Sequence, residues 1–313
     1  MPQTIIEHLR QEAVQELFKM KTFSNAWTVW QVDIQRRLTQ LNANNVVNIG
    51  DGLGDVFRTT GVAGRSQSTV SGGGNAWEGL VCWYLNLCLI GSRTVVFKQK
   101  KSLLPAPVRE ALTVSYGTFP SNTESDLIAI TFPDKDEYVK LDKHSITIRD
   151  DSGNLIPTLK GVEFNYLDIV NSLLSRDFSD LEIGVIQCKT NWNDNAQIPM
   201  LWDMIYSSSG FSRGSITVGN SSYSINHTKK FSYSFVTVPT VDMSGINHTS
   251  TCVRRVQNIS GGNYWGYPSK SAVANSIKDI FGRNFSSAST TSLTARLGAE
   301  LPNLRTTYSY FNI

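Results

Sequence analysis

Hydrophobic positions recur at helical spacing near the start of the chain and again ahead of the first apolar strands. Residues 4–20 and about 25–42 each gather their large apolar side chains on one stripe, which predicts two amphipathic helices. Ser24 or Asn25 is expected to cap the second helix, and Asn75 to cap a third, apolar helix that follows it. The N-terminal part of the protein is therefore expected to be mainly helical.

Short apolar runs that end in polar turns predict the strands and the helices between them. Strands are expected at residues 94–98, 127–132, 182–189, 231–238 and 249–258, with a hairpin at 145–159. Further helices are expected at residues 105–117, 162–175, 195–207 and 271–282. Residues 261–267, GGNYWGY, are expected to form an aromatic-glycine loop.

These elements predict an α/β (α+β) protein whose central mixed sheet of about five strands is flanked by helices. The sequence has no internal repeat and no Pro/Ser-rich linker, so a single domain is expected over residues 1–313. Within it, residues 1–74 are expected to supply N-terminal helices and a Gly-rich loop, residues 75–240 the core, and residues 241–313 a β-rich addition.

Composition narrows the class of protein. With 40% hydrophobic and 18% charged residues in a chain of 313, the sequence is typical of a globular protein. The net charge of +3 permits a nucleic-acid partner without requiring one. The four cysteines lack metal-site spacing and lie mostly in apolar segments, so buried free thiols in a reducing cytosol are expected. The first residues lack the apolar segment of a signal peptide and no run suits a membrane span, which favours a cytoplasmic location.

The most informative stretch is residues 181–206, in which an apolar strand ends in Gln187-Cys188-Lys189. Side chains alternate along a strand, so Gln187 and Lys189 share one face while Cys188 points into the core. A lysine at the end of a buried strand needs an anionic partner, such as a carboxylate, a metal-bound hydroxide or a phosphate. Asp126 occupies a comparable position, where a polar turn becomes an apolar strand.

An aspartate that opens one strand and a Gln187-x-Lys189 that ends a later one resemble the core of the PD-(D/E)XK nucleases, and within them the type II restriction endonucleases. The resemblance implies a restriction-endonuclease-like catalytic core in residues 75–240, with DNA recognition and dimerisation in residues 241–313. It also implies Mg²⁺-dependent, sequence-specific hydrolysis of double-stranded DNA by a homodimer or a tetramer. Asp126 would bind the metal and Lys189 would support the attacking water.

The sequence departs from the family pattern because the neutral Gln187 stands where the motif has an acid. Either Gln187 coordinates the metal through its amide oxygen, or another carboxylate replaces the missing one, as in one branch of the restriction endonucleases. Asp203, about four turns along the helix after Lys189, is one candidate. Glu78, on the helix upstream of Asp126, is the other, although it also fits the third position of a capping box.

The residues expected to contact DNA lie in four segments, three of which also have a simpler structural explanation. They are Arg58 and Arg65 in the Gly-rich residues 48–74, the basic cluster Lys98, Lys100 and Lys101, the polar turn Asn191, Asn193 and Asp194, and the pair Arg254 and Arg255. The Gly-rich segment is either a surface loop or a segment that orders over DNA. It lacks the GKS/GKT ending of a phosphate-binding loop, so no nucleotide cofactor is expected. The lysine cluster could equally be a solvated face, and Asn193 or Asp194 could cap the next helix.

Two other functions fit the same residues. A repair or junction-resolving nuclease would use the same core, although the predicted C-terminal addition favours sequence readout. A non-catalytic DNA-binding or structural protein would explain Gln187 as the remnant of a lost site. The histidines are scattered, so they do not support a Ser-His-Asp triad, an HNH-type site or a zinc site.

Overall fold

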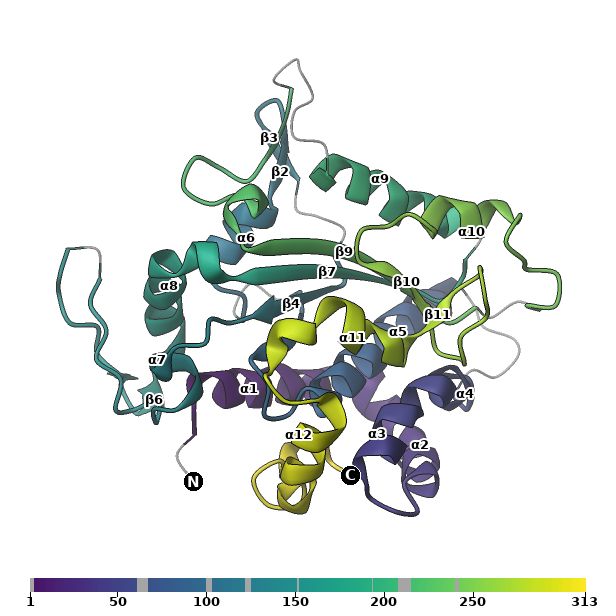
Figure 1. Ribbon diagram of the computed structural model, residues 1–313, viewed down its shortest axis with the longest axis horizontal. Coiled ribbons are helices and arrows are strands. Elements are labelled where there is room, and N and C mark those ends of the chain that lie inside the picture. Colours follow the sequence, from purple (N-terminus) through teal and green to yellow (C-terminus); the bar gives the residue numbers. More distant parts are fainter. Residues whose placement is uncertain are drawn as a thin grey trace.

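A mixed sheet of six strands, in the order β1-β4-β7-β9-β10-β11, forms the centre of the described part of the protein in the computed structural model (Figure 1). The strands are β1 Thr94–Lys98, β4 Leu127–Thr131, β7 Glu182–Lys189, β9 Lys230–Thr237, β10 Gly262–Trp265 and β11 Asn275–Ser276. The structure describes residues 3–60, 67–99, 103–121, 125–150, 152–192, 194–207, 215–239 and 242–313, apart from the side chains of residues 67–72 and of Asp194.

β7 lies between β4 and β9 and is buried along its length as far as Cys188. β4 is antiparallel to β1 and β7, whereas β7, β9, β10 and β11 are parallel to their neighbours in turn. A strand that is covered on both faces appears in the sequence as a nearly continuous apolar run. For this reason the strand predicted at residues 182–189 is confirmed at both ends.

Helices from both ends of the chain cover one face of the sheet, the lower face in Figure 1. Val96, Ala129 and Ile186 of the sheet share a core with these helices. They are α1 Ile5–Lys19, α2 Lys21–Arg37, α3 Ala43–Asn48, α4 Leu53–Arg58, α5 Gln67–Cys88, α11 Ile280–Asn284 and α12 Leu293–Glu300. α1 packs against the edge strand β1 and contributes side chains to the cores on both faces of the sheet.

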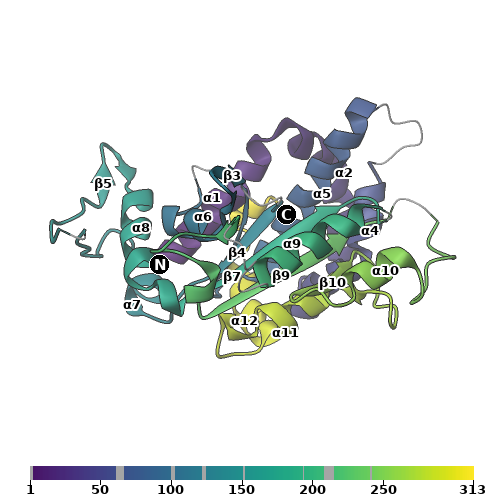
Figure 2. The same cartoon turned by 90° about the horizontal axis from the view of Figure 1, so that it is seen from above.

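The opposite face packs Phe97, Ile128 and Val185 against a second set of helices. These are α6 Ala106–Leu112, α7 Asp136–Val139, α8 Tyr166–Arg176, α9 Gln197–Ser207 and α10 Thr251–Val256. Figure 2 shows α9 lying along β9, and the two elements are in contact. The coarse prediction of a mixed sheet flanked by helices is therefore confirmed for an α+β protein.

Smaller elements surround this core. Two small sheets are formed by β2 Val114–Tyr116, β3 Phe119–Ser121 and β8 Ile216–Val218, and by β5 Leu159–Lys160 and β6 Glu163–Phe164. The short 3-10 helices are η1 Ile49–Gly52, η2 Phe178–Asp180, η3 Asp194–Ala196, η4 Ile225–His227, η5 Ile277–Asp279, η6 Ser286–Ala288, η7 Leu301–Asn303 and η8 Ser309–Phe311. The hairpin predicted at residues 145–159 is confirmed only near its turn, where an antiparallel bridge joins Arg149 and Leu155 and the Ile156 N–H donates to Ile148 O at 2.9 Å.

The expectation of a loop at residues 48–74 is wrong for the residues that are described. These described residues include the last residue of α3, all of η1 and α4, and the first turns of α5. Gly54 makes this possible, because its backbone N–H donates to Gly266 O at 2.8 Å and a Cβ there would collide with the Tyr267 ring. The helix predicted to start after Asn75 therefore begins earlier, and Asn75 and Glu78 lie inside it rather than in a capping box.

Two predicted caps and the C-terminal elements also need correction. α2 begins after Met20, which places Ser24 and Asn25 inside the helix. The strand predicted at residues 249–258 is the helix α10, whose Cys252, Val253 and Val256 are buried at helical spacing. The predicted loop at 261–267 contains β10, which pairs with β9 in the central sheet. Residues 242–313 are thus mainly short helices rather than a β-rich addition.

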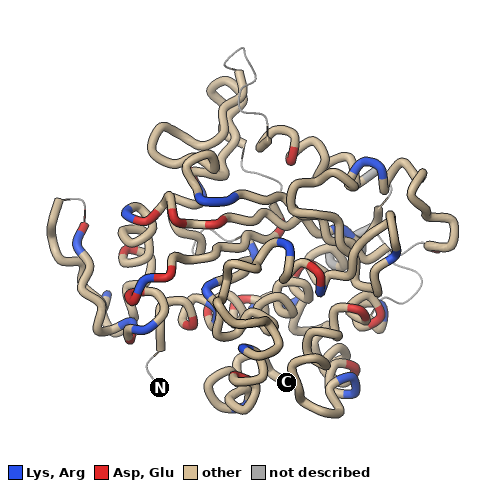
Figure 3. Tube along the Cα trace, viewed as in Figure 1, with Lys and Arg blue, Asp and Glu red and all other residues tan. Residues whose placement is uncertain are grey.

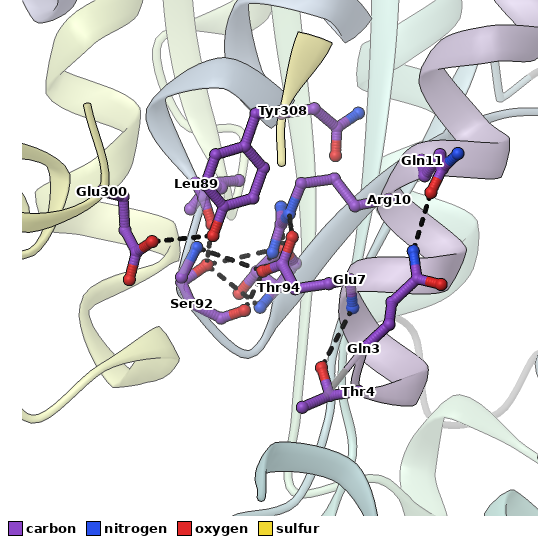
Figure 4. Close-up of polar contacts among 12 residues, drawn as sticks. Gln3, Thr4, Glu7, Arg10, Gln11, Leu89, Ser92, Thr94, Glu300 and Tyr308 are labelled. Carbon is purple, nitrogen blue, oxygen red and sulfur yellow. Dashed lines mark hydrogen bonds and ion pairs between the residues drawn. The ribbon is translucent and has the colours of Figure 1, made fainter. Parts of the chain in front are cut away.

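A buried arginine ties α1 to the start of β1 (Figure 4). Arg10 is fully buried, and its Nε lies 3.0 Å from Glu7 Oε2. Its Nη1 and Nη2 donate to Thr94 O at 2.8 Å and Ser92 O at 2.9 Å. A cavity of about 420 Å³ opens beside this network, lined in part by Glu7, Ser92 and Glu300. It lies at the opposite end of β1 from Lys98.

The cysteine prediction is confirmed, because all four cysteines are free and buried. Burial raises the pKa of the Cys82 thiol to about 12, so this group is a protonated core side chain. No helix in the described part of the chain combines the length and the apolar character that a membrane crossing needs.

Replacing Arg10 with methionine is expected to lower the free energy of unfolding by about 3 kcal/mol, because it leaves two carbonyl oxygens and Glu7 without their buried partner. Urea unfolding of Arg10→Met measures this loss. Arg36→Met is the matched control, since the Arg36 side chain is 73% exposed and also pairs with a carboxylate. Its expected effect is below about 1 kcal/mol. Equal losses in both variants would contradict a structural role for the buried arginine.

Candidate active site

Asp126 and Lys189 meet where β4 begins and β7 ends. The antiparallel register places Leu127 opposite Ile186, which brings Asp126 to the end of β7. Asp126 Oδ2 accepts a hydrogen bond of 2.7 Å from the backbone N–H of Cys188. Lys189 Nζ lies 3.9 Å from the same oxygen, an ion pair longer than a hydrogen bond. Two residues far apart in the sequence thus form one charged pair at the edge of the core.

A second pair of opposite charges reaches the same place from α5 and β1. Glu78 on α5 forms an ion pair with Lys98 Nζ, which also donates to Asn75 Oδ1 at 3.0 Å. Lys98 lies opposite Leu127 in the β1–β4 register, so it is next to Asp126 in the sheet. The carboxylates of Asp126 and Glu78 are close enough to interact electrostatically. The site therefore contains two carboxylates and two lysines.

The carboxylate of Asp126 is held in an unfavourable environment. Burial raises its pKa from 3.8 to about 6, and the negative charge of Glu78 adds to the increase. Lys189, the Cys188 N–H and Lys98 oppose it. Burial followed by the charges of Asp126 and Glu78 raises the pKa of the Cys188 thiol, which leaves that group protonated and unsuited to metal binding or nucleophilic attack.

Gln187 faces the interior rather than solvent. Its side chain is fully buried, and its Oε1 accepts a 2.7 Å hydrogen bond from the Tyr233 hydroxyl on β9. Its Nε2 is buried without a hydrogen-bond partner among the described residues. An ionised acid in this position would be a buried charge, which is costly without a cation beside it. The amide is thus suited to joining β7 to β9.

Asp203 lies on α9, and Ser260 provides its hydrogen bonds. One carboxylate oxygen accepts from the Ser260 hydroxyl at 2.6 Å and the other from the Ser260 N–H at 3.1 Å. Ser260 Oγ in turn accepts from the backbone N–H of Tyr233, which lies opposite Val185 in the sheet. Val185 is four residues before Lys189, or roughly 13 Å along the strand. Burial raises the pKa of Asp203, and the Ser260 bonds oppose this. The structure therefore does not bring Asp203 to the Asp126 pair.

The predicted DNA contacts fall into two groups. Arg65, Lys100, Lys101 and Asn193 lie outside the described residues, and Asp194 starts η3 with its side chain undescribed. Arg58 Nη2 donates to Pro239 O at 2.6 Å, and its guanidinium lies over the Tyr267 ring. Asn191 follows Lys189 and has a buried Oδ1 without a hydrogen-bond partner in the described chain. Arg254 and Arg255 lie on α10, which packs against η3 just beyond the end of β7.

The residues at this site fit a hard divalent cation. No group of three or more His, Cys, Asp or Glu side chains suited to a metal occurs among the described residues. Mg²⁺ does not need such a group, because it is commonly held by one or two carboxylates together with water and substrate phosphate. Asp126 and Glu78 supply two carboxylates whose mutual repulsion a cation would relieve. Gln187, whose amide oxygen is buried against Tyr233, and Asp203, which Ser260 holds away from the Asp126 pair, fit less well.

Two features of the site were not expected from sequence. The pairing of Lys98 with Glu78 and Asn75 was missed because the basic cluster suggested a solvated face, and only the β1–β4 register brings Lys98 to Asp126. The use of Gln187 as an internal partner of Tyr233 was also missed, although the apolar residues around it are a signal of burial. Comparison with protein-family models and with curated proteins gives no match that would assign a family.

Asp126→Asn is expected to stabilise the metal-free protein above pH 6. The amide oxygen can keep the Cys188 bond while the buried charge is removed. Because the pKa of Asp126 is raised to about 6, the folded protein binds this proton more tightly than the unfolded chain does. The contribution of Asp126 to wild-type stability should therefore fall as the pH rises from about 4 to 6, and the variant should gain about 2 to 3 kcal/mol relative to the wild type.

Urea unfolding in EDTA at pH 8 and at pH 4 measures this difference, which should be large at pH 8 and shrink toward zero at pH 4. Asp134→Asn is the control, since Asp134 is exposed near the other end of β4. If the wild type were more stable than Asp126→Asn at pH 8, the charge on Asp126 would be favourable, contrary to what its burial predicts.

Proposed function

We propose that this protein is a type II restriction endonuclease that hydrolyses phosphodiester bonds of double-stranded DNA at specific sequences, with Mg²⁺. The proposal rests on one observation, the meeting of Asp126 and Lys189 at the end of β7 with Glu78 close enough to raise the pKa of Asp126. Buried carboxylates beside a lysine suit metal-assisted hydrolysis of a phosphodiester. The arrangement of β1, β4 and β7 against α5 supports a restriction-endonuclease-like core.

Each residue of the site would have a distinct role. Asp126 and Glu78 would hold Mg²⁺, which when bound supplies positive charge and makes a coordinated water more acidic. Lys189 would place its ammonium where negative charge develops on the phosphate and would orient the attacking water. Gln187 would fix the end of β7 through Tyr233. Asp203 would hold α9 against the β9–β10 connection.

The DNA-binding surface would include the segments around the end of β7. Arg254 and Arg255 on α10, beside η3, would contact phosphates or base edges. In Figure 3, Lys and Arg positions are interspersed with Asp and Glu positions along the trace. This favours DNA binding through a few local contacts rather than through one broad basic surface.

Cleavage of both strands at a palindrome requires two sites related by a twofold axis, so we propose a homodimer, or a tetramer built from it. The buried thiols suit the cytoplasm.

Lys189→Ala is expected to lower the cleavage rate at least about 100-fold and to leave DNA binding largely intact. Digestion of a plasmid with Mg²⁺ measures cleavage, with EDTA as the negative control, and a gel-shift measures binding. Lys140→Ala is the matched variant, because the Lys140 side chain is 70% exposed and far from the site in the fold. The wild type is expected to give discrete bands, whereas a smear would favour a general or repair nuclease. Full activity of Lys189→Ala would refute the assignment of this lysine.

Glu78→Gln and Asp203→Asn separate the two candidates for the second metal-binding acid. Glu78→Gln is expected to abolish Mg²⁺-dependent cleavage, because Glu78 interacts with Asp126. Asp203→Asn is expected to keep cleavage and to lower stability by about 1 to 2 kcal/mol, because it weakens the bonds to Ser260. Plasmid digestion and urea unfolding of both variants give the comparison. The reverse pattern would make Asp203 the metal ligand and Glu78 a structural residue.

A further inference from the structure

Lys98 is held by two polar partners. Its ammonium contacts two side chains of α5, the Glu78 carboxylate and the Asn75 amide oxygen, which are three residues apart and so lie on one face of the helix. The Lys98 and Glu78 side chains are 19% and 16% exposed. A lysine that is bound in this way does not lie free on the surface to meet a DNA phosphate.

The two lysines of the site differ in how they are held. Lys189 lies 3.9 Å from Asp126 Oδ2, an oxygen that already accepts the Cys188 N–H. Lys98 makes hydrogen bonds to both of its partners. Lys98 thus occupies Glu78, the carboxylate that the proposed function assigns to the metal, whereas Lys189 forms only a long ion pair with Asp126.

We propose that Lys98 is a resident cation that occupies Glu78 in the free protein and moves to a DNA phosphate when a divalent metal binds, so that metal and DNA binding promote each other. The inference rests on the proposed function, because it needs Asp126 and Glu78 to be the metal ligands. Three groups carry it: the ammonium of Lys98, the carboxylate it occupies, and Asp126 one position away in the sheet.

Electrostatics explains why the two ligands would be coupled. A divalent cation at Glu78 must displace the ammonium and would otherwise lie beside another positive charge. Lysine has a flexible four-carbon stem and a compact charge, so Lys98 can leave Glu78 while β1 stays in place. A DNA phosphate bound at the site would offer the displaced ammonium a new partner. By linkage, whatever DNA does to metal affinity, the metal does equally to DNA affinity.

Calorimetric titration with Ca²⁺, without DNA, tests the first half of the proposal. Lys98→Met keeps the length of the side chain and removes its charge, so it should bind Ca²⁺ about tenfold more tightly than the wild type. Lys229→Met is the matched control, because Lys229 forms an ion pair of 3.2 Å with Glu182 at the other end of β7. It should leave Ca²⁺ affinity unchanged. Lys98→Gln provides a second neutral variant should Lys98→Met fail to fold.

Binding to a duplex plasmid fragment over a range of salt concentrations tests the second half of the proposal, the move of Lys98 to a DNA phosphate. In EDTA, wild type and Lys98→Met should have the same salt dependence, because Glu78 holds Lys98. With Ca²⁺, the variant should lose about one phosphate contact from the slope of log K against log salt. A loss of DNA affinity of equal size in EDTA and in Ca²⁺ would make Lys98 an ordinary phosphate contact and overturn the inference.

The proposed function and this inference fail in different ways. One result would overturn the role of Lys98 and leave the metal site intact. In it, Lys98→Met and Lys98→Gln bind Ca²⁺ with wild-type affinity, whereas Asp126→Asn abolishes Ca²⁺ binding. If Asp126→Asn leaves Ca²⁺ affinity unchanged, both alone and combined with Lys98→Met, the metal site itself is overturned.

Discussion

The hydrogen bond from the Cys188 N–H to Asp126 Oδ2 is the interaction on which the site depends. It forms because β4 starts where β7 ends, in an antiparallel register that sets Leu127 opposite Ile186. This bond fixes a carboxylate at the edge of the core, beside Lys189 and within reach of the charge on Glu78. Burial and the charge on Glu78 raise the pKa of Asp126, so the ionised carboxylate makes this part of the protein less stable than a neutral side chain would.

Secondary structure was predictable where burial leaves a regular pattern in the sequence. β7 is covered on both faces, and its apolar run gave both bounds of the strand. The errors arose where tertiary contacts override local preference. Gly54 accepts close contact with Gly266 and Tyr267, which lets a glycine-rich segment pack as short helices. The aromatic-glycine residues of β10 form a strand because β9 offers a free edge to pair with.

The proposed site could be predicted in part. Asp126 and Lys189 were found because charged groups at the mouths of apolar strands need partners, and the two do meet. The partner of Lys98 could not be predicted, because it depends on the pairing of β1 with β4 and on the packing of α5. Asp203 has a spacing that suits a ligand, but spacing along a helix does not say which neighbour the side chain meets, and here it meets Ser260.

We propose that Asp126 and Glu78 together hold a divalent cation. Anomalous diffraction from crystals of the protein soaked in Mn²⁺ can locate the metal without reference to activity. We expect a peak between the two carboxylates, with Lys98 Nζ withdrawn from Glu78. A peak at Asp203, or at Gln187 with Glu78 still paired to Lys98, would show that the metal binds elsewhere.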